Sequence, residues 1–410
     1  MKTLLILGGG TAGTMMANKL VDQLDRQWQV VVVDPERDHI YQPGLLFLPF
    51  GAIREEKMVR ERKQTFRKNV IWKRTAIRQM DPKTKQVEFE DGSTHPYDVA
   101  IIATGTRIRP DMTPGLEAGP AAGIHDFYTL TGAKALQQAL KGFNHGRLVL
   151  NVVEMPIKCP VAPLEFLFLA DDYFKRRGIR EQVELVYATP LDAAFTKPYA
   201  AKKLGYLLEE KGIHLETEYM TCEVDTANQR MVSYDERQVG FDLLVSVPTH
   251  SGAAFIADSG LGNELDFVPT DRHSLKASDL EDVFVLGDAT DLPASKAGSV
   301  AHFQAEILTE NVLAHINGQA LPAAFDGHAN CFVETGAGKA MLIDFNYEIE
   351  PLPGHFPLAK LGPFRLMHES RINHWGKLAF RPIYWHALLP GRHIPLSPHM
   401  QISGKQIIAS

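Results

Sequence analysis

The N-terminus of the chain combines a buried strand, a glycine-rich turn and a helix, and this combination restricts the fold more than any other feature. Residues 3–7 predict a buried parallel strand, Gly8-Gly9-Gly10-Thr11-Ala12-Gly13 follows, and residues 14–24 predict a helix. Glycines with this spacing, between a strand and a helix, are typical of a dinucleotide-binding turn. The sequence therefore predicts an α/β fold that begins with a nucleotide-binding unit.

The three spaced glycines of this turn have separate physical roles. Gly8 allows the tight turn, Gly10 lets the backbone approach a pyrophosphate, and Gly13 lets the helix pack closely on the strand. Thr11 and Ala12 lie within the turn, just before the predicted helix whose unpaired N–H groups face the phosphates. We expect these five residues to bind the nucleotide.

An acidic residue stands where this motif places the ligand of the ribose. The predicted strand Val30–Val33 ends in Asp34, about twenty residues past the last glycine. A lone glycine motif is a weak signal, whereas a motif with both strands, the helix and the acid is a strong one. The alternative is a glycine turn with an incidental acid at a strand end.

Two later turns indicate which nucleotide is bound. One buried strand leads into Thr104-Gly105, and another leads into Gly287-Asp288. These segments resemble those of the two-dinucleotide-domain flavoproteins, the relatives of glutathione reductase. The resemblance implies bound FAD, and it gives the Asp288 carboxylate the role of holding the ribityl and pyrophosphate region. The alternative for Asp288 is a surface acid at a strand end.

The second glycine motif that NAD(P)H-dependent relatives carry is absent. A predicted strand, Arg147–Val153, stands at the matching place, but no glycine occurs between Gly146 and Gly178. Prolines and side chains fill the turn where a pyrophosphate needs bare backbone, so nicotinamide binding is not expected. The turn presents Cys159 instead, while later strand and helix patterns still predict a second βαβ-like domain.

Two cysteine contexts carry a more specific resemblance. Cys159 lies in Pro-x-Lys-Cys-Pro-x-Ala-Pro-x-Glu, and Cys331 lies in Asn-Cys-Phe-Val-Glu-Thr-Gly. With the segments 41–51 and 296–312, these contexts resemble the sulfide:quinone oxidoreductases and the related flavoprotein subunit of flavocytochrome c sulfide dehydrogenase. The resemblance covers nearly the whole chain.

The resemblance implies a pair of catalytic thiols beside the flavin. Cys159 and Cys331 match family cysteines that bridge sulfur atoms until sulfide attacks the bridge and a persulfide thiolate reduces the flavin. Glu165 matches a carboxylate proposed as base, and it is equally a first-turn acid of a predicted helix, 163–174. Lys158 is expected to favour the neighbouring thiolate. The alternative for each cysteine is a small buried hydrophobe.

Two further features bear on how the flavin is held. Lys296 precedes a predicted helix, 298–316, where a positive charge and the helix dipole stabilise reduced, anionic flavin; a solvated loop lysine is the alternative. Some family members link FAD through a cysteine, but residues 105–151 and the N-terminal hundred contain none. We therefore expect non-covalent FAD. No role is assigned to Cys222.

The C-terminal part of the chain interleaves aromatic and basic residues, Lys377 among them, as is typical of a segment that lies at a membrane surface. Trp375–Leu389 is the predicted anchoring helix, interrupted near Pro382. The resemblance implies that this region binds the membrane and covers the quinone, with Phe332 and Phe380 matching aromatic residues that sandwich the quinone ring. The alternative is a capping or dimerisation element that buries the same residues.

Composition excludes several classes of function. The 410 residues include 43 basic and 49 acidic side chains, a net charge of -6, which gives no basic surplus for nucleic acid. Three isolated cysteines predict neither a metal site nor a disulfide framework. The pattern of a signal peptide is missing, as is an apolar run of about 18 residues. We expect a cytoplasmic protein, peripheral on the inner or plasma membrane, and leave homo-oligomers open.

The sequence thus predicts two Rossmann-like dinucleotide-binding domains and a C-terminal region for membrane and quinone. We expect an FAD domain at 1–110 and 245–325, a second domain with a degenerate nicotinamide site at 111–244, and a C-terminal domain at 326–410. The expected function is FAD-dependent oxidation of sulfide to sulfur or polysulfide, with a membrane quinone as acceptor. The alternatives are a type II NADH:quinone oxidoreductase, a sulfide dehydrogenase that donates to cytochrome c, and a sulfur carrier or electron-transfer partner without turnover.

Overall fold

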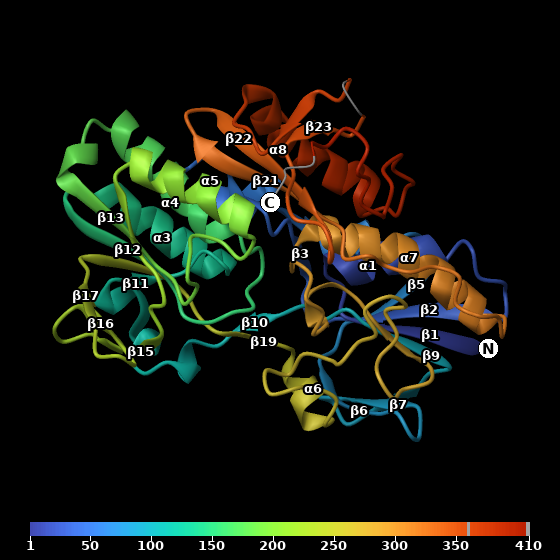
Figure 1. Ribbon diagram of the computed structural model, residues 1–410. Helices are drawn as coiled ribbons and strands as arrows, with labels where there is room; N and C mark the ends of the chain where they lie inside the picture. The colour runs from blue at the N-terminus through green and yellow to red at the C-terminus, as the bar shows by residue number, and fades with distance from the viewer. Residues whose placement is uncertain (359–360, 407–410) are drawn as a thin grey trace.

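The computed structural model describes residues 1–358 and 361–406, so Lys360 and the last four residues of the expected C-terminal domain lie outside the described residues. Two parallel sheets and one C-terminal sheet form the centres of three neighbouring parts of the molecule (Figure 1). The predicted α/β class with two Rossmann-like domains is confirmed.

The first sheet is parallel, and both of its faces are covered. Leu4 and Ile6 pack among residues of the helices α1 (Thr11–Leu20) and α7 (Gly298–Ile316), whereas Leu5 and Leu7 pack against a small antiparallel sheet. Because both faces are buried, the central strands carry continuous apolar runs, such as Leu4–Leu7 and Val30–Val33, and do not alternate with polar residues. The strands, in spatial order, are β20 (Val283–Val285), β9 (Val99–Ile102), β1 (Lys2–Leu7), β2 (Trp28–Val33) and β5 (Val70–Lys73).

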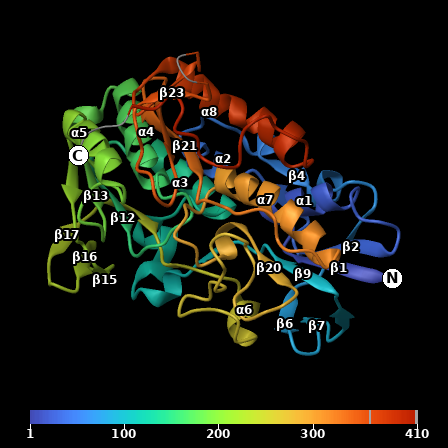
Figure 2. The same cartoon turned by 45° about the vertical axis from the view of Figure 1, so that its right-hand side comes forward.

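Smaller elements complete this first domain. The helices α1 and α7 lie side by side on one face, and an antiparallel sheet with α6 lies at the other (Figures 1 and 2). The bounds are α1 (Thr11–Leu20), α7 (Gly298–Ile316), β6 (Ile77–Asp81), β7 (Gln86–Phe89), β8 (Thr94–Pro96), α6 (Ala254–Asp258), α2 (Gly44–Phe47), β3 (Asp38–Ile40) and β4 (Val59–Glu61).

The helix after the glycine turn differs from its prediction at both ends. α1 begins at Thr11 instead of residue 14, because Gly10 is extended and its carbonyl oxygen already accepts a hydrogen bond of 3.0 Å from the Thr14 N–H. It ends at Leu20, and the residues up to Leu24 form turns. The glycine turn thus runs directly into the helix, whose N-terminus faces the end of the sheet.

The second domain repeats the pattern of the first. Its parallel sheet is covered by three helices on one face and by an antiparallel sheet on the other. Its strand β18 (Leu243–Val247) runs past the expected domain boundary at 244, so a boundary after Val247 fits the sheets better. The remaining bounds are β11 (Ile124–His125), β12 (Gly146–Val152), β13 (Val183–Ala188), β14 (Ile213–Glu216), α3 (Leu130–Gly142), α4 (Ala162–Arg176), α5 (Pro198–Glu210), β15 (Thr221–Asp225), β16 (Arg230–Ser233) and β17 (Gln238–Gly240). A two-stranded link, β10 (Arg107–Ile108) with β19 (His250–Ser251), joins the domains.

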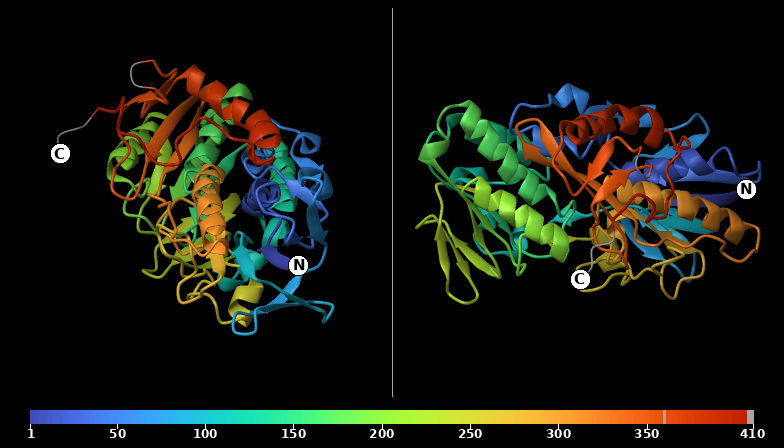
Figure 3. Two further views of the ribbon diagram at one scale, coloured as in Figure 1. Left: turned by 90° about the vertical axis from the view of Figure 1, so that its right-hand side faces the viewer. Right: turned by 45° about the horizontal axis from the view of Figure 1, so that its top comes forward.

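The C-terminal region lies across the junction of the two domains, as the right-hand view of Figure 3 shows for the red helix α8. Its sheet consists of β21 (Ala329–Gly336), β22 (Lys339–Phe345), β24 (Phe364–Leu366) and β23 (Gly354–Phe356). Helix α8 (Arg371–Ile383) packs on this sheet and continues into a π-helical turn, Tyr384–Leu388. Among the helices of the described residues, each is too short or too polar to cross a bilayer.

Candidate functional site

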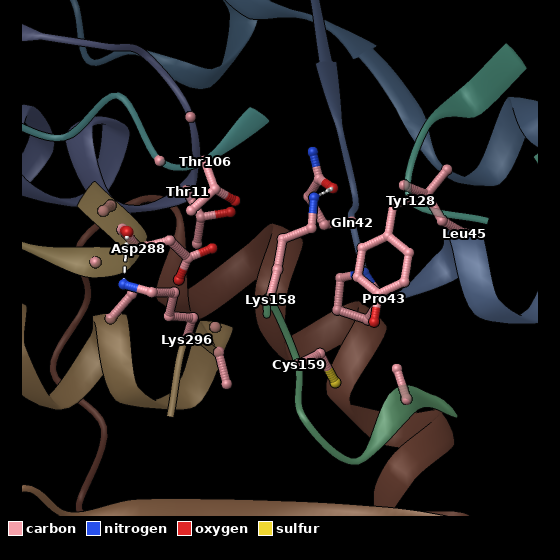
Figure 4. Close-up of a pocket in the computed structure, with 18 of the residues that line it drawn as sticks. Thr11, Gln42, Pro43, Leu45, Thr106, Tyr128, Lys158, Cys159, Asp288 and Lys296 are labelled. Atoms are coloured by element: carbon pink, nitrogen blue, oxygen red, sulfur yellow. Dashed lines mark hydrogen bonds between the residues drawn. The ribbon is translucent and has the colours of Figure 1, made fainter. Parts of the chain in front are cut away.

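A cavity lies where the two Rossmann-like domains meet the C-terminal region. Figure 4 shows Thr11, Asp288 and Lys296 of the first domain on one side, and Lys158, Cys159 and Tyr128 of the second domain on the other. Most of the predicted site residues line it. These are Gly10, Thr11, Ala12, Thr104, Gly105, Cys159, Glu165, Gly287, Asp288, Lys296 and Phe380.

The glycine turn at one end of the cavity leaves room for a pyrophosphate. A Cβ atom on Gly13 would lie 1.9 Å from the Gly8 carbonyl oxygen, and one on Gly8 would lie 2.5 Å from the Ala103 carbonyl oxygen. Only glycine fits at either position. A Cβ atom on Gly10 would have no neighbour within 4 Å in the described structure, so this side of the turn faces open space.

Asp34 is fixed at the strand end where a dinucleotide ribose binds. Its carboxylate accepts a hydrogen bond of 2.7 Å from the Gly9 N–H and lies 3.3 Å from the Arg62 guanidinium. Arg62 is buried and also donates to the carbonyl oxygens of Gly9 and Asp38. Sequence reasoning missed Arg62, because its partners lie more than twenty residues away along the chain.

Several buried polar groups along the cavity have no hydrogen-bond partner among the described residues. They include the hydroxyl groups of Thr104, Thr106 and Tyr128. Burial raises the pKa of the Asp288 carboxyl, although Lys296 and Lys158 oppose that shift. A buried polar group without a partner is costly, and a bound polar ligand removes that cost. The hydroxyls and phosphates of FAD suit these groups, so the residues present fit the expected cofactor.

Lys296 lies inside the protein and not in a solvated loop. Its ammonium group donates to the carbonyl oxygens of Asp288 at 2.9 Å and Thr290 at 2.6 Å, and it lies 4.0 Å from the centre of the Phe267 ring (Figure 4). Burial lowers the pKa of Lys296 to about 8, while Asp288 opposes the shift. Helix α7 begins two residues later, so a cation and a helix N-terminus lie together at this wall.

The turn after β12 carries Cys159 out of the second domain and into the cavity. Its backbone N–H donates a hydrogen bond of 2.6 Å to the Lys296 carbonyl oxygen of the first domain. Cys159 has a φ of 54°, a left-handed conformation that is uncommon for a residue other than glycine. Strained backbone of this kind clusters at functional sites. The neighbouring Lys158 donates to the Gln42 side chain at 2.9 Å.

Both candidate cysteines share one electrostatic environment. Burial raises the pKa of Cys159 well above its usual value and that of Cys331 to about 11; Glu165 adds to both shifts, and Lys377 opposes both. Lys377 thus offsets the effect of burial at both thiols. Burial lowers the pKa of Lys158, and the charge of Cys159 opposes that shift. That Lys158 favours the thiolate stays a prediction. Cys331 lies on β21 next to Asn330, whose carbonyl oxygen accepts a hydrogen bond of 2.7 Å from the Ser299 hydroxyl at the start of α7.

Glu165 and Lys377 form a buried ion pair between the second domain and α8. The Lys377 ammonium group lies 2.6 Å from a carboxylate oxygen of Glu165 and 2.8 Å from the Phe332 carbonyl oxygen. The Glu334 N–H donates to the same oxygen of Glu165 at 2.8 Å. Burial raises the pKa of Glu165, with Lys377 opposing it. Glu165 is thus both the first-turn acid of α4 and a wall of the cavity.

The position of Lys377 differs from the predicted one. It was expected among the basic residues of an interfacial segment, but its side chain points inward to Glu165. A signal was present: Lys377 and Phe380 stand three residues apart on one helix, so they share a face. Both line the cavity.

The opposite face of α8 is apolar and exposed. Ile372, Trp375, Leu378 and Ile383 are each more than two-fifths exposed. Only one of the two predicted quinone residues lines the cavity among the described residues, and it is Phe380. The Phe332 ring lies outside that lining, with its centre 5.3 Å from the centre of the Phe364 ring.

Comparisons with known proteins agree with this geometry. The family model described as pyridine nucleotide-disulphide oxidoreductase matches residues 2–153. The mitochondrial sulfide:quinone oxidoreductase of Dictyostelium discoideum is 26% identical over 396 residues, which are 95% of this chain and 86% of that protein. The Mus musculus protein of the same name is 25% identical, with 94% and 86% covered. The chain is similar to sulfide:quinone oxidoreductases along nearly its whole length. It is a flavoprotein oxidoreductase.

Solved structures share the fold of this chain. The sulfide:quinone oxidoreductase of Aquifex aeolicus superposes with a TM-score of 0.82 at 17% identity and covers 96% of this chain and 92% of its own. A chain in the mitochondrial ATP synthase structure of Tetrahymena thermophila superposes with a TM-score of 0.78 at 16% identity, with 95% and 96% covered. Because one fold serves several functions, these likenesses establish architecture alone.

Replacing Lys377 by methionine tests the buried ion pair. Lys377→Met leaves the Glu165 carboxylate buried without a cation, so we expect the free energy of unfolding to fall by about 3–5 kcal/mol in urea titrations. The double variant Lys377→Met, Glu165→Gln removes both charges and should recover much of that loss. Arg78→Met, which breaks an exposed pair with Glu88, is the control and should cost less than about 1 kcal/mol. If Lys377→Met lowers the free energy of unfolding by as little as the control variant does, the assignment of a buried Glu165–Lys377 ion pair is contradicted.

Proposed function

We propose that the chain oxidises sulfide to sulfur or polysulfide and passes the electrons through non-covalent FAD to a membrane quinone. The position of Cys159 carries the proposal. The turn that would bind a nicotinamide dinucleotide extends a thiol into the cavity where FAD fits. The relatives named sulfide:quinone oxidoreductase, which align along nearly the whole chain, support the same choice of substrate and acceptor.

The proposed reaction uses Cys159 and Cys331 as the two ends of a sulfur bridge. Hydrosulfide attacks one sulfur of the bridge, so that one S–S bond breaks, one cysteine leaves as a thiolate and the other keeps the added sulfur as a persulfide. The bridge forms again when these two sulfurs bond, which releases two electrons and one proton. FAD, when bound, supplies the two-electron acceptor. Repeated additions lengthen the bridge until sulfur leaves as polysulfide.

Glu165 is the proposed proton acceptor. Burial raises the pKa of its carboxyl towards the range in which a base exchanges protons at neutral pH, and the carboxylate oxygen that Lys377 does not contact has no partner among the described residues. Burial also raises the pKa of both thiols, so the incoming hydrosulfide, and not a resting thiolate, is the nucleophile that starts the reaction.

The proposed path to the acceptor runs along α8. Phe380 gives a quinone ring an aromatic contact at the cavity, while the exposed apolar face of α8 gives the protein a way to lie on a bilayer. Phe332, the second aromatic residue proposed for the quinone site, packs its ring against Gly376 of α8 and so supports the helix that carries Phe380. This arrangement makes the protein peripheral on the inner or plasma membrane.

Serine variants of the two cysteines test the proposed chemistry. Cys159→Ser and Cys331→Ser should each lower the rate of sulfide-dependent flavin reduction by roughly 100-fold or more, because neither can form the bridge. The FAD content should stay unchanged. Cys222→Ser is the matched control, since Cys222 lies on β15 in the antiparallel sheet of the second domain, and its rate should equal that of the parent. Sulfide-dependent quinone reduction that persists in both test variants rules the thiol mechanism out.

A surface variant tests membrane attachment. Trp375→Ser with Leu378→Ser removes the two most exposed large hydrophobic side chains of α8. Because burying each contributes about 1.5–3 kcal/mol, we expect binding to vesicles of mixed zwitterionic and anionic lipid to weaken at least tenfold in sedimentation assays. Tyr234→Ser, at an exposed position of the second domain, should bind as the parent does. Equal binding by the α8 variant and its parent contradicts attachment through this face.

A further inference from the structure

The segment Tyr384–Gly391, here called the clasp, leaves the end of α8 and returns to the first domain. The Tyr384 hydroxyl lies 2.8 Å from the Thr11 hydroxyl and 2.6 Å from the His39 Nε2 atom. Thr11 is the first residue of α1, directly within the glycine turn. Tyr384 is buried and lines the same cavity as Thr11. A side chain of the C-terminal region is thus bonded to the turn that holds a dinucleotide.

The clasp is held by contacts that do not involve this hydroxyl group. The Asn18 side chain donates to the Leu389 carbonyl oxygen at 2.8 Å, and the Arg67 side chain donates to the Pro390 carbonyl oxygen at 3.2 Å. The Trp385 ring lies 4.3 Å from the Arg60 guanidinium. These contacts all come from the first domain. Removing the Tyr384 hydroxyl therefore leaves the path of the clasp defined.

The three polar groups of the contact form an uncharged chain. His39 is 1% exposed, and burial lowers its pKa to about 3, so its imidazole is neutral at neutral pH. Burial also raises the pKa of Tyr384 above its usual value, which keeps the hydroxyl protonated. A neutral imidazole, a phenol and an alcohol each donate or accept as their partners require. The chain from His39 through Tyr384 orients the Thr11 hydroxyl.

We propose that Tyr384 is a cofactor-positioning residue that orients Thr11 and closes the cavity at the pyrophosphate end of FAD. The clasp then has to open before FAD leaves, so the C-terminal region controls how long the cofactor is retained. This inference rests on the non-covalent FAD of the proposed function, but it does not depend on the identity of the electron donor or the acceptor. Its test accordingly follows FAD and not turnover.

The test is the rate of FAD release from the holoprotein, followed by the rise in flavin fluorescence after dilution. Tyr384→Phe keeps the ring and its packing but loses both hydrogen bonds, so we expect release to become about five- to tenfold faster. Asn18→Ala, which frees the Leu389 carbonyl from outside the cavity, should also speed release, and it provides the test if Tyr384→Phe fails to fold. Tyr347→Phe is the control, because its hydroxyl donates to Arg272 outside the cavity.

A second measurement separates cofactor positioning from a purely structural role. The increase in Tm that FAD confers should be smaller in Tyr384→Phe than in the parent, whereas it should be unchanged in Tyr347→Phe. One outcome overturns the role of Tyr384 alone: Tyr384→Phe lowers the Tm of the apoprotein and of the holoprotein by the same amount, and the rate of FAD release is unchanged. In that outcome FAD can still be extracted, so the proposed non-covalent binding stands. Flavin that stays with acid-precipitated protein overturns both this inference and the proposed non-covalent binding.

Discussion

One backbone hydrogen bond, from the Cys159 N–H to the Lys296 carbonyl oxygen, joins the chemistry-bearing turn of the second domain to the first. Lys158 and Lys296 form a parallel bridge at the same point. On one side of the bond stands a thiol in a left-handed backbone conformation, and on the other a buried lysine with a helix start behind it. The cavity depends on this junction, because it brings a side chain of the second domain to the cofactor site of the first.

Buried charges hold the C-terminal region over that junction. Glu165 and Lys377 pair across 212 positions of sequence, and Asp344 pairs with Lys405 near the end of the described chain. The His328 Nε2–H donates at 2.8 Å to the same Asp344 carboxylate, and Asp344 pairs across the sheet with Asn330, the neighbour of Cys331. Breaking a buried pair is costly because one charge is left uncompensated. These pairs therefore fix β21, α8 and the clasp relative to the cavity.

Much of the site could be predicted from the sequence, because its signals are local. The glycine turn, the Gly287-Asp288 turn and Cys159 each follow a recognisable strand, and the carboxyl ends of parallel strands meet at one edge of a sheet. The helix expected at 298–316 matches α7. The absence of a second glycine motif after the strand of the second domain was also informative, because it predicts that this domain does not bind a nicotinamide dinucleotide.

The rest depends on contacts that no local pattern contains. Arg62, Lys377 and Tyr384 reach their partners only after the chain has folded, and each looks like an ordinary loop or tail residue in the sequence. The tail helix begins at Arg371, not near Trp375, because the Ser370 hydroxyl caps it by accepting from the Asn373 N–H at 3.0 Å. Pro382 falls in its last turns, and the chain continues into a π-helical turn instead of breaking.

The central claim is that a sulfur-handling thiol, and not a nicotinamide ring, occupies the space beside the flavin. The direct measurement is anaerobic stopped-flow mixing of the FAD-loaded protein with either sulfide or NADH, followed at the flavin absorbance band. The account predicts rapid bleaching by sulfide and none by NADH. Bleaching by NADH, with a flavin that stays oxidised in sulfide, would contradict it.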